Sequence, residues 1–439
     1  MFRTLLVFAL IAAAATTASA ANPTFYKDVL PVLQERCQEC HRAGEIGPMT
    51  LFTYKETRPW AKSIREVVRT KKMPPWFANP NHGKFVNDRS LSQSEIDILA
   101  AWSDTGAAEG SPKDAPAPKQ WTSGWGMPVR PDVVIGMKQP FSLPAAATID
   151  YQYIVIPTGF TEDKWVQMVE ARPSNRGVVH HAVVFVRGPA DKWLRGEAKP
   201  FEPWSPPKTG ADGKPRQGDI DGFGAEFLTV YTPGNLPDVF KPGQARLIKA
   251  GSDLVLQMHY TTNGKPGTDL TQIGLVFSKE KPLERIITVA VGNSRFVIPP
   301  GDPAYRVPTR FQVPNDSTIL SFFPHMHVRG KGFEYKVQLP GEEMKTMLQV
   351  DNYNFNWQLS YRLAEPLKFP AGTRFEFTGI FDNSPNNPYN PDPKSQVRFG
   401  EQSWEEMSIG FFDLAVPLDM DRKSFFRRSS PTPPAPRAE

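Results

Sequence analysis

The hydrophobic pattern of this 439-residue chain changes its period once, at a proline-rich stretch, and that change limits the possible folds most. Before the stretch, apolar residues recur at helical spacing, as in Thr24–Arg36, where Phe25, Val29 and Leu33 share one face. From residue 131 onward, short alternating or β-branched runs are separated by turn residues. We therefore expect a multidomain protein with a small all-α domain followed by all-β domains.

The helical segment contains two further helix signals. Apolar residues at Trp60, Ile64 and Val68 mark a second helix. A third begins at Ser92-Gln93-Ser94-Glu95, a capping box in which the serine and glutamate side chains each satisfy a free backbone amide.

The β-rich region is nearly 300 residues long, which is large for one sandwich. We expect two tandem sandwiches joined near Lys281–Arg285, with a long, weakly patterned insertion at 187–250. The predicted segments are a signal peptide at 1–20, an all-α domain at 22–107, a linker at 108–130, β-domains at 131–285 and 286–428, and a disordered tail at 429–439.

The N-terminus is typical of a secretory signal. Arg3 precedes an apolar core, and Ala18-Ser19-Ala20 is a small-residue cleavage site. A chain cleaved after Ala20 is expected to be periplasmic or secreted, with no transmembrane segment left. The 51 basic and 46 acidic residues are interspersed, and their net charge of +5 is too small and scattered to indicate nucleic-acid binding.

The chain's two cysteines stand in Cys37-Gln38-Glu39-Cys40-His41. Cys-x-x-Cys-His is the attachment motif of a c-type haem, with the thiols adding to the two vinyl groups and the histidine reaching the iron. A disulfide, a thioredoxin-like pair and half of a zinc site are the competing interpretations. The motif predicts one covalent haem c.

The sixth haem ligand is predicted to be Met73, on the proline-stiffened loop Lys72-Met73-Pro74-Pro75-Trp76. A thioether ligand raises the haem potential and suits electron transfer. Met49 and His82 are the alternatives.

Five of the seven histidines lie in three strand-like motifs. His325 and His327 are two residues apart, so a strand places both rings on one face. His180 and His181 would face opposite ways unless the strand is bulged or the rings use different nitrogens. His259 follows in Gln257-Met258-His259-Tyr260.

The ligand type limits which metal these histidines would bind. Imidazole suits zinc, copper, iron and nickel. No thiolate is left, because both cysteines are assigned to haem, and a thioether ligand would point to copper. Zinc on three histidines remains an alternative for one site.

Two resemblances follow from these motifs. Residues 24–107 resemble small bacterial cytochrome c domains, which implies electron transfer. Residues 131–420 resemble the copper type II, ascorbate-dependent monooxygenases, the group of the peptidylglycine α-hydroxylating and dopamine β-type enzymes. The resemblance implies two jelly-roll-like β-domains, each carrying one copper across a solvent-filled cleft.

In family terms, one copper would transfer electrons and the other would bind O2. The resemblance assigns the first to His180, His181 and His259, and the second to His325, His327 and Met407, which are the expected catalytic residues. Met407 is chosen because Glu405-Glu406-Met407-Ser408 fits the family's late strand with an acidic residue before the methionine. Gln257 matches the family's Gln-x-His-Tyr pattern.

The sequence also departs from the family. The β-domains contain no cysteine, whereas the animal enzymes are stapled by disulfides. Phe411 stands where those enzymes place a tyrosine that helps to bind substrate. Substrate specificity is therefore not carried over.

The expected function is hydroxylation of a C–H bond by an exported copper-dependent monooxygenase that uses O2. The substrate would be an unidentified small molecule or peptide, and a one-electron donor (an ascorbate-like reductant or a periplasmic redox protein) would supply electrons through the haem. The alternative is a non-catalytic periplasmic electron-transfer or copper-binding protein. A third hypothesis reverses the electron flow, with the copper unit oxidising a substrate and the haem passing electrons outward.

Overall fold

The computed structural model describes residues 22–121, 124–207 and 225–427, and these are mostly β-sheet. The predicted signal peptide at 1–20 and tail at 429–439 lie outside the described residues. No helix in the described ranges is long and apolar enough to cross a membrane.

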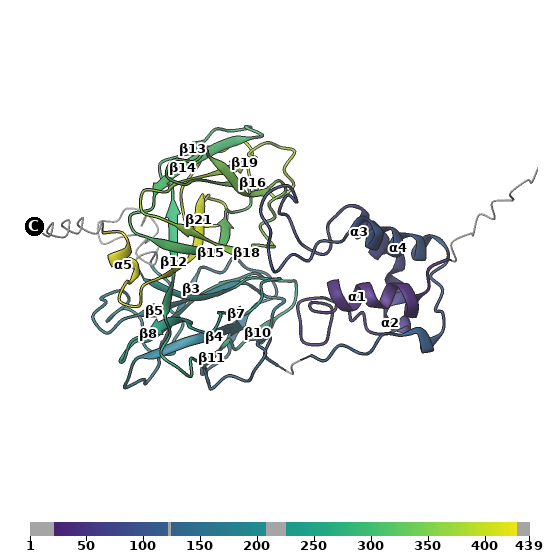
Figure 1. Ribbon diagram of the computed structural model, residues 1–439, viewed down its shortest axis with the longest axis horizontal. Helices are drawn as coiled ribbons and strands as arrows, with labels where there is room; N and C mark the ends of the chain where they lie inside the picture. The colour runs from purple at the N-terminus through teal and green to yellow at the C-terminus, as the bar shows by residue number, and fades with distance from the viewer. Residues whose placement is uncertain (1–21, 122–123, 208–224, 428–439) are drawn as a thin grey trace, which may run out of the picture. The chain divides into compact units, whose positions relative to one another are not determined.

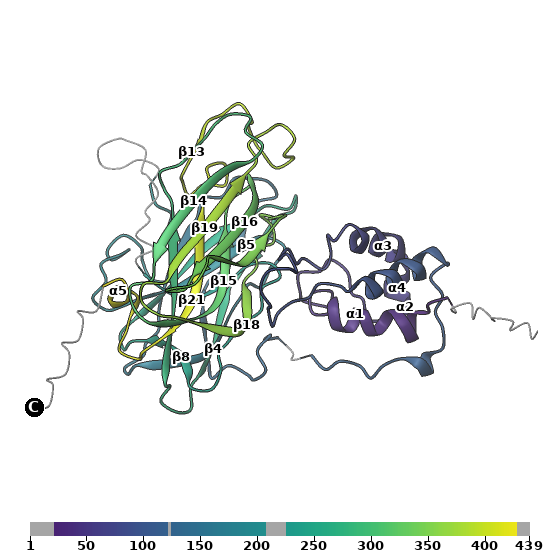
Figure 2. The same ribbon diagram turned by 45° about the horizontal axis from the view of Figure 1, so that its top comes forward.

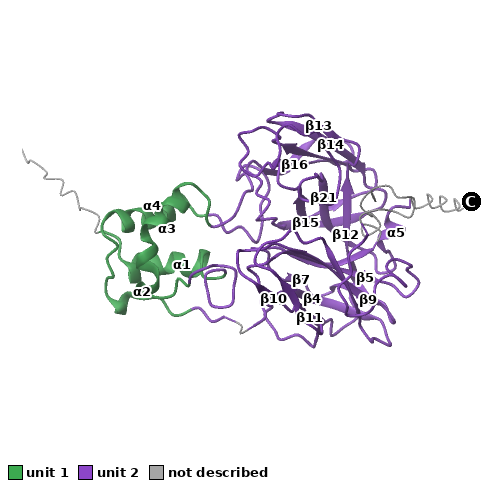
Figure 3. Cartoon of the chain, turned by 180° about the vertical axis from the view of Figure 1, so that it is seen from behind, with its two compact units in different colours: residues 1–39, 50–73, 91–118 green, residues 40–49, 74–90, 119–439 purple. Residues whose placement is uncertain are grey.

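The chain divides into two compact units, coloured separately in Figure 3. Unit 1 comprises residues 1–39, 50–73 and 91–118, and unit 2 comprises 40–49, 74–90 and 119–439. The described helical elements of unit 1 are η1 (Phe25–Val29), α1 (Leu30–Arg36), α2 (Tyr54–Thr57), η2 (Arg58–Trp60), α3 (Ala61–Arg69), α4 (Gln93–Asp104) and η3 (Pro112–Asp114).

The three helices predicted from periodicity are present in unit 1. The first is continuous through η1 and α1, the second is α3, and the third is α4. Ser92 caps α4 by accepting from the Glu95 amide, and Glu95 reaches back to the Ser92 amide, so the predicted capping box is confirmed. Trp102 of α4 is fully buried and donates its indole N–H to the Ala108 carbonyl at 2.9 Å.

Unit 2 consists of several β-sheets, an arrangement consistent with β-sandwich domains. Its described strands are β1 (Val133–Gly136), β2 (Phe141–Leu143), β3 (Gln152–Pro157), β4 (Lys164–Arg172), β5 (Val179–Arg187), β6 (Glu226–Tyr231), β7 (Asp238–Val239), β8 (Gln244–Ile248), β9 (Asp253–Tyr260), β10 (Gly267–Asp269), β11 (Gln272–Phe277), β12 (Glu284–Gly292), β13 (Val297–Ile298), β14 (Tyr305–Gln312), β15 (Ser317–His325), β16 (Gly330–Gln338), β17 (Lys345–Val350), β18 (Tyr361–Phe369), β19 (Arg374–Phe381), β20 (Val397–Arg398) and β21 (Ile409–Val416); the short helix α5 (Arg422–Phe425) follows.

One sheet in the described part of unit 2 has nine strands, with the path β1-β11-β4-β8-β12-β21-β15-β18 and with β7 beside β4. Strands from the earlier half of the region form one side of this sheet, and strands from the later half form the other. Figure 1 shows β12, β21, β15 and β18 following one another across the later half.

A second sheet accompanies each half of the nine-stranded sheet. The order β3-β9-β5-β6 belongs to the earlier half, and β14-β19-β16-β17 belongs to the later half. Figure 2 shows β14, β19 and β16 as a layer in front of β21 and β15. Each half has its own apolar core, centred on residues such as Val169 and Leu256 in the earlier half and Phe322 and Phe375 in the later one.

The two halves meet where β8 pairs with β12 in parallel, Gln244 opposite Glu284 and Ala245 opposite Arg285. The predicted join near Lys281–Arg285 falls at this point. Interpreting 187–250 as one insertion was wrong for its second part, because β6, β7 and β8 lie there and belong to the sheets. These strands are short and separated by turns, so their alternation was weak in the sequence.

Two segments outside the predicted β-domains belong to unit 2 and pack on its strands. Trp76 and Phe85 contact Tyr361 of β18, with ring centroids 5.0 and 5.6 Å away. The end of the predicted linker is also ordered, since Met127 is fully buried and the Gly126 amide donates to Glu170 of β4.

The α4 cap generates a stability prediction. Replacing Ser92 with alanine removes the acceptor for the Glu95 amide and should destabilise α4 by about 1 kcal/mol. Amide hydrogen exchange of α4 measures this change. Ser63→Ala, at an exposed position inside α3, is the control; because alanine is the better helix former, α3 protection should stay the same or rise slightly. Equal effects of the two substitutions on their helices would contradict the role of the cap.

Candidate metal centre and adjoining cavity

The five histidines of the strand-like motifs gather in one region of unit 2. His180 and His181 lie in β5 and His259 lies in β9, all in the earlier half. His325 is the last residue of β15, and His327 lies in the turn that follows, both in the later half.

The adjacent histidines of β5 share one side because the strand is irregular there. The register between β5 and β9 shifts between Val179 and His181, and His181 then stands directly opposite His259. The His180 ring lies 5.3 Å from the His181 ring and 5.0 Å from the His259 ring, measured between centroids. The bulge needed for these three residues to meet is therefore present.

His180, His181 and His259 have the geometry of a metal-ligand set. One ligand atom from each lies within 4.8 Å of the others. The Nδ1 atoms of His180 and His181 are 3.1 Å apart. Two nitrogens that bind one ion at about 2.0–2.1 Å lie roughly 3 Å apart, so this separation suits a shared ion as well as a hydrogen bond.

The hydrogen-bond partners of these rings indicate which nitrogens would bind. His180 Nε2 lies 3.1 Å from the Phe355 carbonyl oxygen, which can only accept, so Nδ1 carries the lone pair. His259 Nδ1 is buried and has no hydrogen-bond partner among the described residues. An orphaned buried nitrogen costs free energy, and a bound cation would remove that cost.

His325 and His327 present Nε2 with its lone pair, whereas His180 presents Nδ1. His325 Nδ1 lies 2.6 Å from Gln358 Oε1, and His327 Nδ1 lies 3.1 Å from the Glu405 carbonyl oxygen. Both partners accept, so both Nδ1 atoms carry the proton and both Nε2 atoms carry the lone pair. His327 Nε2 is buried without a hydrogen-bond partner in the described ranges. The two ring centroids are 5.2 Å apart.

Met407 lies near these two histidines through the pairing of β15 with β21. His325 stands opposite Ile409, two residues after Met407, and the neighbouring Glu406 accepts from the His327 amide. Met407 is buried, and it lines the same cavity as His325. A thioether at this position can complete a soft ligand set with the two imidazoles.

Glu406 holds the turn that carries His327. Its carboxylate accepts from the backbone amides of His327 at 2.8 Å and Arg329 at 2.7 Å. The side chain is fully buried, and burial raises the pKa of Glu406 to about 8. The acidic residue before Met407 therefore positions the backbone of a neighbouring histidine.

The two histidine groups adjoin each other. The His181 and His325 ring centroids are 6.5 Å apart. Phe355 stacks on His180 with centroids 4.2 Å apart, and its ring is 6.2 Å from that of His327. Phe355 thus contacts both groups.

Gln358 connects the two groups through hydrogen bonds. Its Oε1 accepts from His325, and its Nε2 donates to the Phe355 carbonyl at 3.3 Å, the same carbonyl that accepts from His180. The Gln358 carbonyl is itself held by the Thr232 hydroxyl at 2.5 Å. One amide side chain therefore helps to orient a histidine in each group.

Sequence reasoning missed Phe355 and Gln358, because nothing in their spacing links them to the histidine motifs. It also missed Tyr151, whose ring lies 4.8 Å from that of His259 and 5.7 Å from that of His181. Gln257, which matches the family's pattern in the sequence, lines the cavity and donates to the Tyr153 hydroxyl at 2.6 Å.

Loss of solvent keeps all five histidines uncharged near neutral pH. Burial lowers the pKa of His180 and His325 to about 4 each and that of His327 to about 3. Burial also puts the pKa values of His181 and His259 well below the usual range, and the neighbouring histidines add to the effect. Neutral imidazole is the form that binds metal.

A cavity of about 110 Å³ adjoins both groups. One water needs roughly 10–15 Å³ by this measure, so the cavity has room for several waters or a small organic molecule. His181, Val183 and Phe185 of β5 line one wall, and His325 and Phe323 of β15 line the facing wall. Each wall runs from a histidine to apolar side chains at the two-residue period of a strand.

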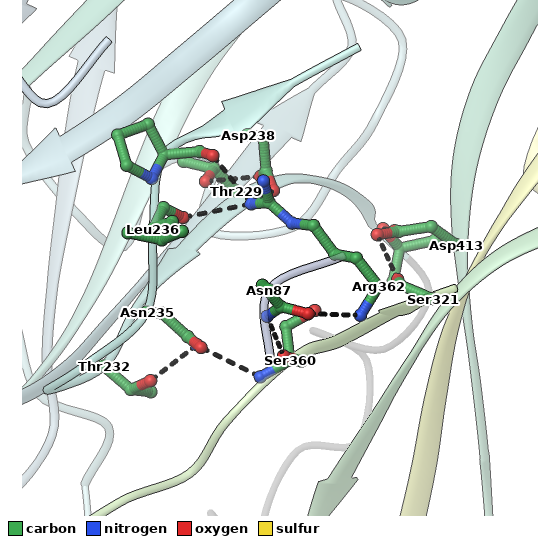
Figure 4. Close-up of polar contacts among 12 residues, drawn as sticks. Asn87, Thr229, Thr232, Asn235, Leu236, Asp238, Ser321, Ser360, Arg362 and Asp413 are labelled. Atoms are coloured by element: carbon green, nitrogen blue, oxygen red, sulfur yellow. Dashed lines mark hydrogen bonds and ion pairs between the residues drawn. The ribbon is translucent and has the colours of Figure 1, made fainter. Parts of the chain in front are cut away.

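The end of the cavity away from the histidines is polar. Asp413 accepts from Arg246 at 2.8 Å, Thr288 at 2.6 Å and Ser321 at 2.8 Å. Figure 4 shows Ser321 bonded to Asp413 and, close by, Arg362 bonded to Asp238. We call these six residues the polar end.

The predicted haem residues are divided between the units. Cys37, at the C-cap of α1, and Met73 belong to unit 1, whereas Cys40 and His41 belong to unit 2. Neither unit alone contains the whole predicted site. The motif lies in a turn after α1 ends at Arg36, so the two cysteines are not on a continuous helix.

The hydrogen bond of His41 fixes which of its ring nitrogens presents a lone pair. Its Nδ1 lies 3.2 Å from the Met49 carbonyl oxygen, which leaves the Nε2 lone pair available. Burial lowers the pKa of His41, which favours the neutral form. Gly47 is needed in this loop, because a Cβ there would lie 2.6 Å from the Cys40 carbonyl oxygen and 2.7 Å from His41 Nδ1.

Glu45 fixes the loop that follows His41 within unit 2. Its carboxylate pairs with Arg172 at 3.4 Å and also with Arg176, and its side chain is only 7% exposed. The alternatives to Met73 as sixth ligand, Met49 and His82, both lie in unit 2. Met49 supplies the carbonyl oxygen that accepts from His41. His82 is partly buried, and its backbone amide donates to the Asn79 carbonyl.

Comparison with models of known protein families gave no match, and comparison with curated proteins gave none. Among solved structures, PNGF-II aligns at 10% identity with a TM-score of 0.28, over 64% of this chain and 65% of the PNGF-II chain, less than two thirds of its length. The VP2 subviral particle of infectious bursal disease virus aligns at 10% identity with a TM-score of 0.19, over 66% of this chain and 73% of VP2. Likenesses this weak carry no functional inference.

The lowered histidine pKa values predict how stability depends on pH. In the unfolded chain a histidine titrates near 6.5, so between about pH 6.5 and 4 the unfolded state binds protons that the folded state does not. The free energy of unfolding of metal-free protein should therefore fall as the pH is lowered through this window. Urea unfolding measures it, and His180→Gln should make the pH dependence shallower. The same slope in wild type and variant would contradict the prediction.

Gln358 should matter to metal binding by both groups. Gln358→Leu removes the acceptor for His325 and the donor to the Phe355 carbonyl, and loss of such partners typically weakens metal affinity about 10- to 100-fold. Titration of metal-free protein with Cu²⁺, followed by electron paramagnetic resonance, measures both sites.

Gln257→Leu is the matched control, because this cavity glutamine donates to Tyr153 and not to a histidine. Its copper affinities should stay close to those of the wild type. Two unchanged signals in Gln358→Leu would show that the amide does not position the ligands.

Proposed function

We propose that this chain is an exported, haem- and copper-containing monooxygenase that hydroxylates a C–H bond of an organic substrate with O2. The observation that carries the proposal is the meeting of two neutral histidine groups beside one cavity, with His181 and His325 rings 6.5 Å apart. The donor set suits copper, since it combines imidazoles with the thioether of Met407. The jelly-roll-like character of the two β-domains belongs to the same proposal.

The available lone pairs indicate which residues would hold the two coppers and the haem. His180, His181 and His259 would hold one copper, and His325, His327 and Met407 would hold the other. Cys37, Cys40 and His41 would hold the haem, with Met73 as the proposed sixth ligand. When bound, the haem would supply electrons one at a time, and the coppers would supply redox chemistry toward O2.

The reaction balances with two electrons and two protons. A C–H bond of the substrate breaks and a C–O bond forms with one oxygen atom of O2, while the second oxygen atom leaves as water. A one-electron donor outside the chain, an ascorbate-like reductant or a periplasmic redox protein, must supply both electrons.

The chain's own residues bind and orient the participants. Gln358 and the Phe355 carbonyl keep His325 and His180 in the tautomers that present a lone pair to the centre. Glu406 holds the turn bearing His327. The apolar cavity wall excludes bulk water from a substrate placed beside His325 and Met407.

The loop that carries Cys40 and His41 is held in unit 2 by Glu45. Its ion pairs with Arg172 and Arg176 are largely removed from solvent, with side chains 21% and 16% exposed. Because these ion pairs fix the loop in place, we infer that it does more than connect neighbouring segments of the chain.

Metal analysis combined with isotope-labelled O2 tests the function. Purified full-length protein should contain two coppers and one covalent haem per chain. With ascorbate as reductant and ¹⁸O2, the wild type should place one ¹⁸O atom in the product of a small organic substrate, as measured by mass spectrometry. Met407→Leu should reduce labelling at least about tenfold, because it removes the thioether ligand.

Met347→Leu in β17 is the control, because that methionine packs on the later core, and it should label product like the wild type. A wild type that binds copper and haem but labels no product would favour the alternative, a non-catalytic electron-transfer or copper-binding protein. Oxidised but unlabelled product would favour outward electron flow.

A further inference from the structure

The kind of side chain that lines the cavity changes in a regular order along its length. On β15, His325, Phe323 and Ser321 face it at alternate positions, and on β21, Phe411 stands opposite Phe323 and Asp413 opposite Ser321. Four residues of strand span about 13 Å. The lining therefore changes from histidine to aromatic ring to polar group over the length of a small organic molecule.

The middle of the cavity is a continuous aromatic wall. The Phe411 ring lies 6.2 Å from His325, 5.7 Å from Phe323 and 5.3 Å from Phe227, measured between centroids. Phe227 in turn lies 4.7 Å from Phe185. Such a wall favours a ring that can pack edge-to-face or offset against it.

The charges at the polar end are already paired. Arg246 is 2.8 Å from Asp413, and Arg362 is 3.2 Å from Asp238. Glu401 is a further carboxylate in the cavity lining, and it interacts electrostatically with Tyr151. Tyr151 lies against the histidines and is not part of the polar end. A charged ligand group at the polar end would lose its hydration, and it would find no unpaired opposite charge there to replace it.

The polar end still offers hydrogen-bonding capacity. The Ser321 hydroxyl lines the cavity and donates to Asp413 at 2.8 Å, so its oxygen still has lone pairs that can accept a hydrogen bond. A ligand hydroxyl or amide N–H can donate to this oxygen without bringing a charge into the cavity.

We propose that the cavity takes an uncharged molecule with an aromatic ring against Phe227 and Phe411 and a hydroxyl or amide group at the polar end. This names the substrate class of the proposed monooxygenase and rests on that function. The ring-bearing end of the molecule then lies toward His325 and Met407, where its C–H bonds would be oxidised.

Three compounds that share one ring and chain length test the proposal: 3-phenylpropan-1-ol, 3-phenylpropanoate and 3-phenylpropylammonium. Calorimetric titration of full-length protein under argon measures binding where no O2 permits turnover. The alcohol should bind at least about tenfold more tightly than either ion. Equal or tighter binding of an ion, or no binding of the alcohol at millimolar concentration, would overturn the proposal.

Cavity variants locate the ligand. Phe227→Leu should weaken binding of the alcohol severalfold by shortening the aromatic wall, and Ser321→Ala should weaken it by altering the polar end. Phe277→Leu, an aromatic-to-leucine change in β11 outside the cavity lining, is the control. Ser321→Ala removes a single hydroxyl, so it keeps the test decisive if Phe227→Leu fails to fold. Affinities equal to the control in both cavity variants would reject the assignment.

The outcomes separate this proposal from the proposed function. Binding of the alcohol without ¹⁸O incorporation into any substrate would reject the oxygenase and keep the ligand class. Labelled product from charged compounds only would keep the oxygenase and reject the ligand class.

Discussion

The arrangement of unit 2 depends on a short parallel pairing between β8 and β12. Only Gln244–Ala245 and Glu284–Arg285 take part, yet this pairing joins the sheet strands of the two halves into one nine-stranded sheet. Side chains reinforce it: Gln244 donates to Glu284 at 2.8 Å, and Arg285 reaches Glu226 at 2.6 Å. Because each half supplies one histidine group, the position of one half against the other determines whether the groups meet.

Neutral histidines gathered in a buried site are costly unless their nitrogens are satisfied. The structure satisfies one nitrogen of His180, His325 and His327 with carbonyl oxygens, and each partner comes from the later half. The remaining nitrogens converge with too few protein partners, as His259 Nδ1 and His327 Nε2 illustrate. That imbalance is the physical reason for expecting cations at the centre, and it is independent of any family resemblance.

The cavity unites features that have different structural origins. Its aromatic wall comes from the packing between the halves, where Phe227 of one half meets Phe411 of the other. Its polar end comes from the ion pair between Arg246 on β8 and Asp413 on β21, which lie on either side of β12. Arg246 also donates to Thr288 on β12. Phe411, which departs from the family's tyrosine, is thus part of a wall that suits an uncharged ring.

The sequence by itself determined the elements whose signals are local. The helices of unit 1, the Ser92 capping box and strands such as β5 and β15 follow from hydrophobic period and capping chemistry, and the histidines and Met407 were identified as candidate ligands by spacing and resemblance. Tertiary structure decided the bulge at His181, the roles of Phe355 and Gln358, and the places of β8 and β18 in the sheet. β18 contains Pro366 and lies at a sheet edge, where a proline is tolerated but weakens the strand pattern. Strand pairing and contacts between distant residues depend on how the halves pack, and no local pattern records that packing.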